Sequence, residues 1–277
     1  MNFDRNNTFI RNDIFGFIKT PFRQAPAKAY LNDSREKHLQ ELQAFSARRG
    51  IAAIAGDSGT GKTALIKFFC DALPKNNNKI IYTPFTNSSD NDLLRSLCTA
   101  FDIDPLFHRN KTIAALQLRI RELGSINPII VLDETQNASH KLLETVRLLT
   151  NDEFDSRNSL TLILIGTEDL FRELKKKINE SLRQRITLYC RIHALTEKES
   201  SAYINHCLTE AGTRQEIFQE ESLKYIHDLA LGRMRIINNL AAAALEAASR
   251  EVSSTVELKH IQQAEQVCTL PAAEINR

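Results

Sequence analysis

The residues most clearly arranged for chemistry are consecutive: Gly56, Asp57, Ser58, Gly59, Thr60, Gly61, Lys62 and Thr63. They match the pattern G-x-x-x-x-G-K-[ST], which here follows an apolar segment and opens a helical one. Glycines let backbone amides curl around phosphates, and the N-terminus of the next helix adds partial positive charge. Lys62 would reach the β- and γ-phosphates, and Thr63 would offer a hydroxyl to Mg²⁺. The segment therefore predicts a site for ATP with Mg²⁺.

Two carboxylates form the second candidate, because Asp133 and Glu134 directly follow the apolar run 129–132. Ligands of open α/β sheets lie at the carboxyl ends of the strands, which would place Asp133 where Mg²⁺ is held. Glu134 would then polarise the attacking water as a general base. The alternative interpretation is a strand that ends in a solvated acidic turn.

Three further polar residues lie at places where they could act on a γ-phosphate. Thr167 follows the apolar run 160–166 and could orient water, although it could equally cap the next helix. Arg185 precedes another apolar run and could neutralise charge at a neighbouring subunit's γ-phosphate. The alternative for Arg185 is a surface arginine paired with a carboxylate. Arg235, near the start of an Ala-rich helix, could reach back to the phosphates.

The elements that must position these residues alternate along the chain. Apolar runs at 50–55, 79–84, 128–133, 160–166 and 185–192 predict strands, and helical patterns lie between them. Continuous apolar character with helical crossovers predicts a parallel sheet covered on both faces. Beyond about residue 193 only helical patterns occur, and Thr196 with Glu199 forms a capping box. We therefore predict an α/β nucleotide-binding domain at 36–192 and a helical lid at 193–268, with an extension at 1–35 that packs on the ATPase core and a tail at 269–277.

Composition excludes several classes of protein. The 277 residues are 42% hydrophobic, which is enough to bury a sizeable core, and the net charge of +2 indicates no particular partner. No run approaches the ~18 apolar residues of a membrane span, and the N-terminus does not resemble a signal peptide. The five cysteines lack metal-ligand spacing, which predicts reduced, mostly buried thiols in a cytoplasmic protein.

Taken together, these motifs resemble those of the AAA+ ATPases, and more closely the ATPase domain of ExeA-like secretion proteins. The matching segments are Phe15-Gly16, Pro21-Phe22, Asp133-Glu134-Thr135-Gln136, LRQRI at 182–186, and Arg235 with INNL at 237–240. The similarity runs from about residue 13 to residue 266. One departure is Met234, which stands where this family usually has proline before the lid arginine.

The resemblance implies a fold and a set of roles. The fold would be a P-loop AAA+ module with a five-stranded parallel sheet flanked by helices, followed by a small helical lid. The implied roles are Walker A for Lys62 and Thr63, Walker B for Asp133 and Glu134, sensor 1 for Thr167, arginine finger for Arg185 and sensor 2 for Arg235.

The chain also resembles transposition regulators such as the phage Mu B protein. This predicts an ATP-dependent ring or filament on double-stranded DNA that selects a transposition target and recruits a transposase or another effector. The alternative is a secretion-type assembly ATPase that acts with a separate membrane partner. Secretion relatives look longer, with a membrane span and a wall-binding domain after the ATPase, and this difference favours transposition. A nucleotide-gated scaffold that hydrolyses ATP slowly is a third possibility.

The distribution of charge supports DNA binding in two places. Residues 172–191 contain seven Lys or Arg and two Glu, and four cations between 105 and 121 have no acid among them. Such patches, repeated along an oligomer, would neutralise DNA phosphates without sequence preference. By position in the transposition family, the predicted DNA contacts are His108, Arg109, Lys111 and Thr112. The alternative is that these cations belong to solvated helix faces.

Overall fold

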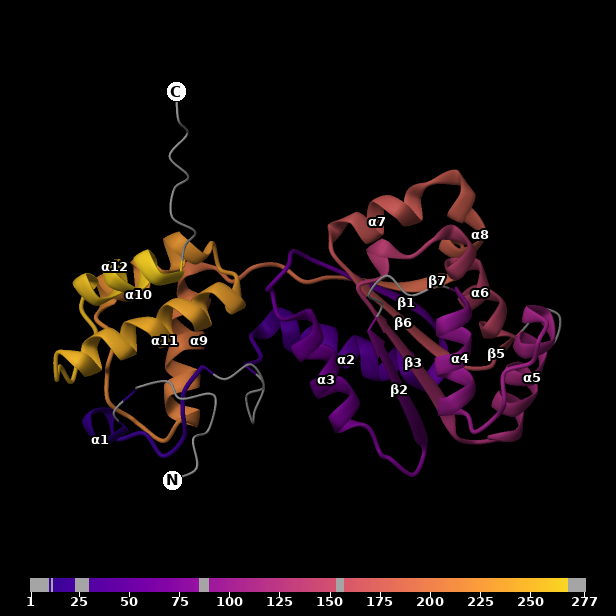
Figure 1. The fold of residues 1–277 in the computed structure, drawn as a ribbon, viewed down its shortest axis with the longest axis horizontal. Coiled ribbons are helices and arrows are strands. Elements are labelled where there is room, and N and C mark those ends of the chain that lie inside the picture. Colours follow the sequence, from indigo (N-terminus) through magenta and orange to yellow (C-terminus); the bar gives the residue numbers. More distant parts are fainter. Residues whose placement is uncertain (1–9, 11, 23–29, 85–89, 153–156, 269–277) are drawn as a thin grey trace. The chain divides into compact units, whose positions relative to one another are not determined.

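Five parallel strands form the central sheet of the α/β part of the chain, in the order β2-β3-β6-β1-β7 (Figure 1). The computed structural model describes residues 10, 12–22, 30–84, 90–152 and 157–268, so the predicted tail at 269–277 lies outside the described residues. The strands are β1 (Gly50–Ala55), β2 (Asn78–Pro84), β3 (Asn127–Asp133), β6 (Thr161–Gly166) and β7 (Ile186–Arg191). All five predicted strands are confirmed, and the strand that precedes Thr167 lies directly beside the strand that precedes the P-loop.

Helices cover both faces of this sheet, because successive strand residues point to opposite sides. On one face, Ile51 and Ala53 belong to a core formed with α4 (Asp90–Ala100), α5 (Arg109–Glu122), α6 (His140–Thr150), α7 (Glu168–Lys175) and α8 (Glu180–Arg183). On the other face, Ala52 and Ile54 pack with α2 (Asp33–Arg48) and α3 (Lys62–Ala72). The predicted two-sided coverage is therefore confirmed, and it explains why the strand residues are continuously apolar.

Short elements fill the connections of the α/β part. A 3₁₀ turn, η1 (Thr135–Asn137), follows β3, and a second one, η3 (Lys177–Asn179), precedes α8. The strands β4 (Asn151–Asp152) and β5 (Arg157–Asn158) pair in an antiparallel arrangement. Sequence patterns did not predict β4, β5 or η3, since each of these elements has only two or three residues.

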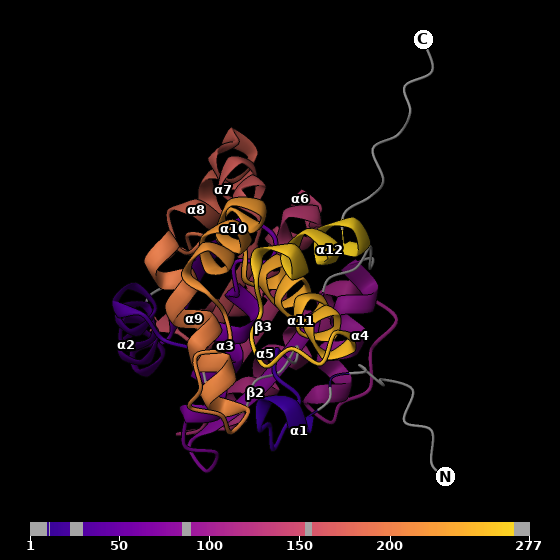
Figure 2. The ribbon, with the colours of Figure 1, turned by 90° about the vertical axis from the view of Figure 1, so that its left-hand side faces the viewer.

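The C-terminal part is helical, as predicted. Its helices are α9 (Glu197–Glu210), α10 (Glu220–Ala230), α11 (Met234–Arg250) and α12 (Leu258–Cys268), which Figure 2 shows gathered in one unit. The predicted capping box is present, since the Thr196 hydroxyl accepts from the N–H of Glu199 and the Glu199 carboxylate accepts from the N–H of Thr196. Alanines of α11 let its neighbours approach closely, and α11 packs extensively on α12.

The N-terminal segment differs from our expectation. It includes α1 (Asn12–Phe15), and its side chains Phe15, Phe17 and Phe22 are buried in the core of the helical part together with residues of α9–α11. Backbone N–H groups of Ile18 and Lys19 also donate to the carbonyl oxygen of Ala211. The prediction that the extension packs on the ATPase core is therefore wrong, because the segment completes the helical core.

The chain thus divides into two compact units. The helical unit comprises residues 1–32, 58–61 and 194–277, and the α/β unit comprises residues 33–57 and 62–193. Among the described helices, none combines the length and the apolar character needed to span a bilayer. All five cysteines are free thiols, and three of them are buried.

Core packing between α3 and the sheet should contribute strongly to stability. Phe69 is fully buried on α3, so Phe69→Ala should lower the free energy of unfolding by about 3–5 kcal/mol through lost burial and a residual cavity. The matched control is Phe107→Ala, because Phe107 is 98% exposed and its removal should change stability by less than about 0.5 kcal/mol. Urea denaturation measures both changes, and equal losses would contradict this description of the core.

Candidate functional site

The P-loop connects the end of β1 to the start of α3, and its lysine is held at the base of the loop. Lys62 is only 8% exposed. Its ammonium group donates to the carbonyl oxygens of Gly56 at 2.8 Å and of Asp57 at 2.9 Å. A buried charge is costly without such partners. The loop therefore holds a positive charge beside the first amide groups of α3, where an anion would bind.

The side chain of Asp133 connects the P-loop to the second predicted motif. Its Oδ2 accepts a hydrogen bond from the Thr63 hydroxyl at 2.9 Å, and its Oδ1 accepts from the N–H of Glu134 at 2.8 Å. Asp133 is the last residue of β3 and is 5% exposed. The structure therefore brings together the two residues predicted to hold Mg²⁺, although they are 70 positions apart. Hydroxyl and carboxylate oxygens are the ligands that Mg²⁺ prefers.

Tyr82, which the sequence analysis missed, also lies at this carboxylate. Its hydroxyl donates to Oδ2 of Asp133 at 2.7 Å, from the neighbouring strand β2. Burial, the hydrogen bond to Asp133 and the negative charges of Asp133 and Glu134 all raise the pKa of Tyr82, so the hydroxyl stays protonated and donates. In the sequence, only the position of Tyr82 near the end of β2 could have indicated a site residue. Tyrosine is common in strands, so this position alone did not distinguish it.

Glu134 is exposed and occupies a left-handed backbone conformation with φ of 60°. This region is uncommon for a residue other than glycine, and it turns the chain sharply from β3 into η1. The Glu134 carboxylate accepts a hydrogen bond from the side-chain amide of Gln136 at 2.6 Å. The residue predicted as general base therefore lies next to the predicted Mg²⁺ ligand, with its carboxylate held by a neighbour.

Thr167 lies at the tip of β6, between β1 and β3 in the sheet. It occupies the N-cap position of α7, but its hydroxyl makes no capping hydrogen bond. Within the described part of the chain, that hydroxyl is buried and has no hydrogen-bond partner. Buried polar groups are normally paired, so an unpaired one indicates a ligand or water. The capping alternative is therefore disfavoured, and a role towards a phosphate stays a prediction.

These features fit ATP with Mg²⁺. The site offers a buried ammonium group for phosphate oxygens at Lys62, two oxygen ligands for a hard cation at Thr63 and Asp133, and an unpaired hydroxyl at Thr167. Each matches a charge or a hydrogen-bonding group of the nucleotide–metal complex.

The two predicted arginines lie in different units. Arg185 is partly exposed between α8 and β7, close enough to Glu144 on α6 that its positive charge helps to lower the pKa of that carboxyl, after the larger effect of Arg147. Arg235 lies in the helical unit, where its N–H donates to the Gly59 carbonyl at 3.2 Å. Its guanidinium also contacts the Ser58 hydroxyl at 3.4 Å. The roles of finger and sensor stay predictions for both arginines.

The predicted DNA-contact segment begins α5 and has mixed exposure. His108 and Lys111 are exposed, whereas Thr112 is 3% exposed and its hydroxyl accepts from the N–H of Leu106 and donates to the Leu106 carbonyl. Thr112 therefore holds the preceding loop, and its side chain is not available for a direct contact with DNA. Arg109 is half-buried and donates to the Thr145 hydroxyl. Beside it lies a pocket of about 300 Å³, lined by Asn91, Leu94, Arg95, Pro105, Leu106, Phe107, Arg109 and Thr112.

The positive segment 172–191 is less available than its composition suggests. Four of its cations form ion pairs with carboxylates: Arg172 with Asp169, Lys176 with Glu173, Arg183 with Glu180, and Arg191 with Glu168. Two of these acids lie just before the segment in the sequence, so counting within the segment overstated its charge. The alternative of a solvated, internally paired surface is favoured here.

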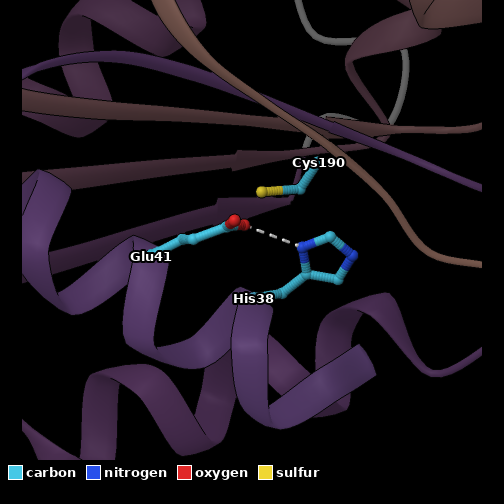
Figure 3. A group of neighbouring side chains, drawn as sticks. All are labelled: His38, Glu41 and Cys190. Carbon is cyan, nitrogen blue, oxygen red and sulfur yellow. Dashed lines mark hydrogen bonds and ion pairs between the residues drawn. The ribbon is translucent and has the colours of Figure 1, made fainter. Parts of the chain in front are cut away.

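One other cluster in the described residues has three groups that could bind a metal: His38 and Glu41 on α2 and Cys190 on β7 (Figure 3). His38 Nδ1 lies 3.1 Å from a Glu41 oxygen, which a hydrogen-bonded pair explains. Burial, with a smaller effect of the Glu41 charge, raises the pKa of the Cys190 thiol to about 12. A protonated thiol is a poor metal ligand, so the hydrogen-bonded pair explains this cluster without a metal, and Thr63 and Asp133 stay the predicted Mg²⁺ ligands.

Known proteins resemble this chain in sequence. Residues 46–174 match the family described as AAA domain. General secretion pathway protein A of Aeromonas hydrophila is 30% identical over 244 residues, which are 84% of this chain and 44% of that protein. The chain therefore spans less than half the length of this curated relative. The AAA match and this relative support an AAA+ ATPase.

Solved structures agree on the fold. Cdc6p of Pyrobaculum aerophilum has a TM-score of 0.75 at 17% identity, over 95% of this chain and 72% of that one. The Orc1 protein of Aeropyrum pernix, in complex with DNA, has a TM-score of 0.64 at 20% identity, over 86% and 66%. At these identities the likeness concerns the fold alone, and it confirms the predicted AAA P-loop fold with a helical C-terminal region.

The hydrogen bond from Tyr82 should matter for Mg²⁺. Tyr82→Phe removes one donor to Asp133, so the carboxylate is less firmly oriented, and the Mg²⁺ concentration for half-maximal ATP hydrolysis should rise roughly three- to tenfold. Tyr189→Phe is the matched control, because Tyr189 is equally 48% exposed and donates to the carbonyl of Arg183 instead. A magnesium titration that gives the same midpoint for both variants would remove Tyr82 from the site.

Proposed function

We propose that this protein binds ATP with Mg²⁺ at residues 56–63 and hydrolyses it, and that its nucleotide state controls the assembly of a partner protein of the secretion type. The observation that carries the proposal is the hydrogen bond of 2.9 Å between Thr63 and Asp133, because it joins the P-loop to the carboxylate that follows β3. The 30% sequence identity to the secretion protein supports a partner of the secretion type and not a transposase.

Each side chain has a distinct task in this proposal. Bound ATP supplies the γ-phosphoryl group, and Mg²⁺ supplies positive charge to its oxygens. Lys62 offers its ammonium group to the phosphates, while Thr63 and Asp133 hold the cation. Glu134 accepts a proton from the attacking water at a carboxylate oxygen, and the unpaired hydroxyl of Thr167 orients that water.

Two arginines complete the proposal. Arg185 acts as a finger across a subunit boundary, which makes the ATPase active as an oligomer, a ring or filament. Arg235, whose N–H binds the Gly59 carbonyl, reports from the helical unit whether ATP or ADP is bound. We also propose that the chain works as an N-terminal extension, an α/β nucleotide-binding domain at 36–192 and a helical lid at 193–268.

A second candidate function is ATP-dependent binding to double-stranded DNA, as in the transposition hypothesis. The observation in its favour is the loop before α5, where Phe107 is 98% exposed beside exposed His108 and Lys111. An exposed aromatic ring among cations suits nucleic acid, which offers bases for stacking and phosphates for pairing. We keep His108, Arg109 and Lys111 as contacts in this candidate, whereas the relatives named above give no support to a transposase partner.

Glu134→Gln should separate nucleotide binding from hydrolysis. The amide keeps the shape of the side chain but cannot accept the proton, so we expect hydrolysis to fall by roughly 100-fold or more with ATP affinity retained. Lys62→Ala should instead abolish measurable affinity, because it removes the buried charge of the P-loop. Calorimetric ATP titration and phosphate release measure the two effects. Unchanged turnover in Glu134→Gln would contradict the assigned base.

Binding to duplex DNA with ATP, with ADP and without nucleotide, across a salt series, separates the two candidate functions. The secretion-type function predicts that ATP does not increase the affinity for duplex DNA. The DNA function predicts ATP-dependent binding that weakens with salt, and Lys111→Ala should reduce the slope of log K against log salt by about 1. Lys198→Ala, an exposed lysine on α9, is the control. ATP-dependent binding that is lost equally in both variants would argue against the loop before α5.

A further inference from the structure

The side-chain amide of Gln136 lies between the predicted base and the tip of β6. Its Nε2 donates to Oε2 of Glu134 at 2.6 Å, and its Oε1 accepts from the N–H of Thr167 at 3.1 Å. We propose that Gln136 is a positioning residue, which fixes the carboxylate of Glu134 relative to Thr167 and so sets where the attacking water is activated. This inference rests on the proposed ATP hydrolysis, and it assigns a task to a residue that touches neither phosphate nor metal.

The amide side chain satisfies both partners at once. The ionised Glu134 carboxylate accepts hydrogen bonds, whereas the N–H of Thr167 can only donate. Rotating the amide by half a turn would set oxygen against carboxylate and N–H against N–H, so the hydrogen bonds define its orientation. Leucine at this position would make neither bond, and glutamate would accept from Thr167 but repel Glu134. The link therefore needs a side chain that both donates and accepts, as the amide of Gln136 does.

The surrounding backbone is shaped to hold this link. Gln136 lies in η1, which is anchored because the buried hydroxyl of Thr135 donates to the Ile165 carbonyl at 2.7 Å. On the opposite side, a Cβ at Gly166 would lie 2.8 Å from Oε1 of Gln136 and 2.9 Å from Cβ of Leu170. Glycine at the end of β6 therefore leaves the room that the amide occupies.

The side chain of Gln136 also connects the two groups that would act on the attacking water, the hydroxyl of Thr167 and the carboxylate of Glu134. The hydroxyl of Thr167, buried without a partner in the described residues, belongs to the residue whose N–H binds Gln136. Glu134 is the residue whose carboxylate binds the other end of the amide. A shift of Thr167 towards or away from a phosphate would thus be transmitted to the base through a single side chain.

The first test is Gln136→Leu, made both in the natural protein and together with Glu134→Gln. If Gln136 acts through Glu134, kcat should fall about tenfold or more in the natural background, with KM for ATP changed less than about twofold, and should not fall further beside Glu134→Gln. An equal fall in both backgrounds would overturn the proposal, as would an unchanged kcat. Gln263→Leu is the matched control, since Gln263 also donates to a glutamate, Glu251, at 3.1 Å but lies in the helical unit.

The second test keeps the proposal falsifiable if the leucine variant folds poorly. Gln136→Glu keeps an oxygen that can accept from the N–H of Thr167 but has no N–H to donate to Glu134. If the bond to Glu134 is what positions the base, kcat should fall about tenfold in the natural background and should not fall further beside Glu134→Gln. An unchanged kcat, or an equal fall in both backgrounds, would overturn the proposal. The melting temperature and ATP affinity of each variant identify losses caused by misfolding.

The outcomes also separate this inference from the proposed function. If the natural protein does not hydrolyse ATP with Mg²⁺, both fall. If the natural protein hydrolyses ATP and Glu134→Gln is slow, the proposed function holds. If Gln136→Leu and Gln136→Glu then behave as the natural protein does, only the role of Gln136 is overturned.

Discussion

The candidate site depends on one hydrogen bond, from the hydroxyl of Thr63 to the carboxylate of Asp133. This bond requires β1 and β3 to run parallel on either side of β6, so that the two residues that follow them meet at one edge of the sheet. It also belongs to a site where opposite charges are buried, since Lys62 is 8% exposed and Asp133 is 5% exposed. Each charge is held by polar groups of the protein, because burial without them would be costly. A ligand that carries both phosphates and a divalent cation complements the two charges at once, which is why the geometry favours a nucleotide with its metal.

Surface charge says less about function than the buried charges do. The segment 172–191 looks strongly basic in the sequence, yet four of its cations pair with carboxylates, and exposed ion pairs of this kind contribute little to stability or affinity. The loop before α5 differs, because an almost fully exposed Phe107 lies there beside His108 and Lys111. The buried hydroxyl of Thr112 holds this loop through both backbone groups of Leu106, so the ring is presented by an ordered backbone. This contrast explains why one basic region supports a second candidate function and the other does not.

Local patterns predicted the sheet well, and the limits of the prediction follow from distance along the chain. The run Gly50–Ala55 is apolar at every position because both faces of β1 are covered, so its bounds could be read directly. The Phe-rich N-terminal segment could be recognised as packed, but nothing local indicated whether it would join a core of the α/β unit or the core of the helical unit. The partners of Arg172 and Arg191 lie at Asp169 and Glu168, outside the segment whose charge was counted. Tyr82 was missed and Gln136 was given no role of its own, because their contacts, to Asp133 and Thr167, reach residues that lie far away in the sequence.

The order of segments along the chain constrains how these cores form. Phe15 and Phe17 are buried among helices that begin near residue 197, so the helical core closes only after the whole α/β sequence has been made. The α/β unit is nearly continuous in sequence and contains Thr63, Asp133, Gln136 and Thr167, so its hydrogen bonds need no residue of the helical unit. Its core can therefore form first, since domains generally fold as units during synthesis. The helical core then forms from the N-terminal segment and the C-terminal helices, which lie on either side of the folded α/β unit in the sequence. This order gives a physical reason for the three buried phenylalanines among residues 15–22, because a short segment needs large apolar side chains to offset the entropy of closing so long a loop.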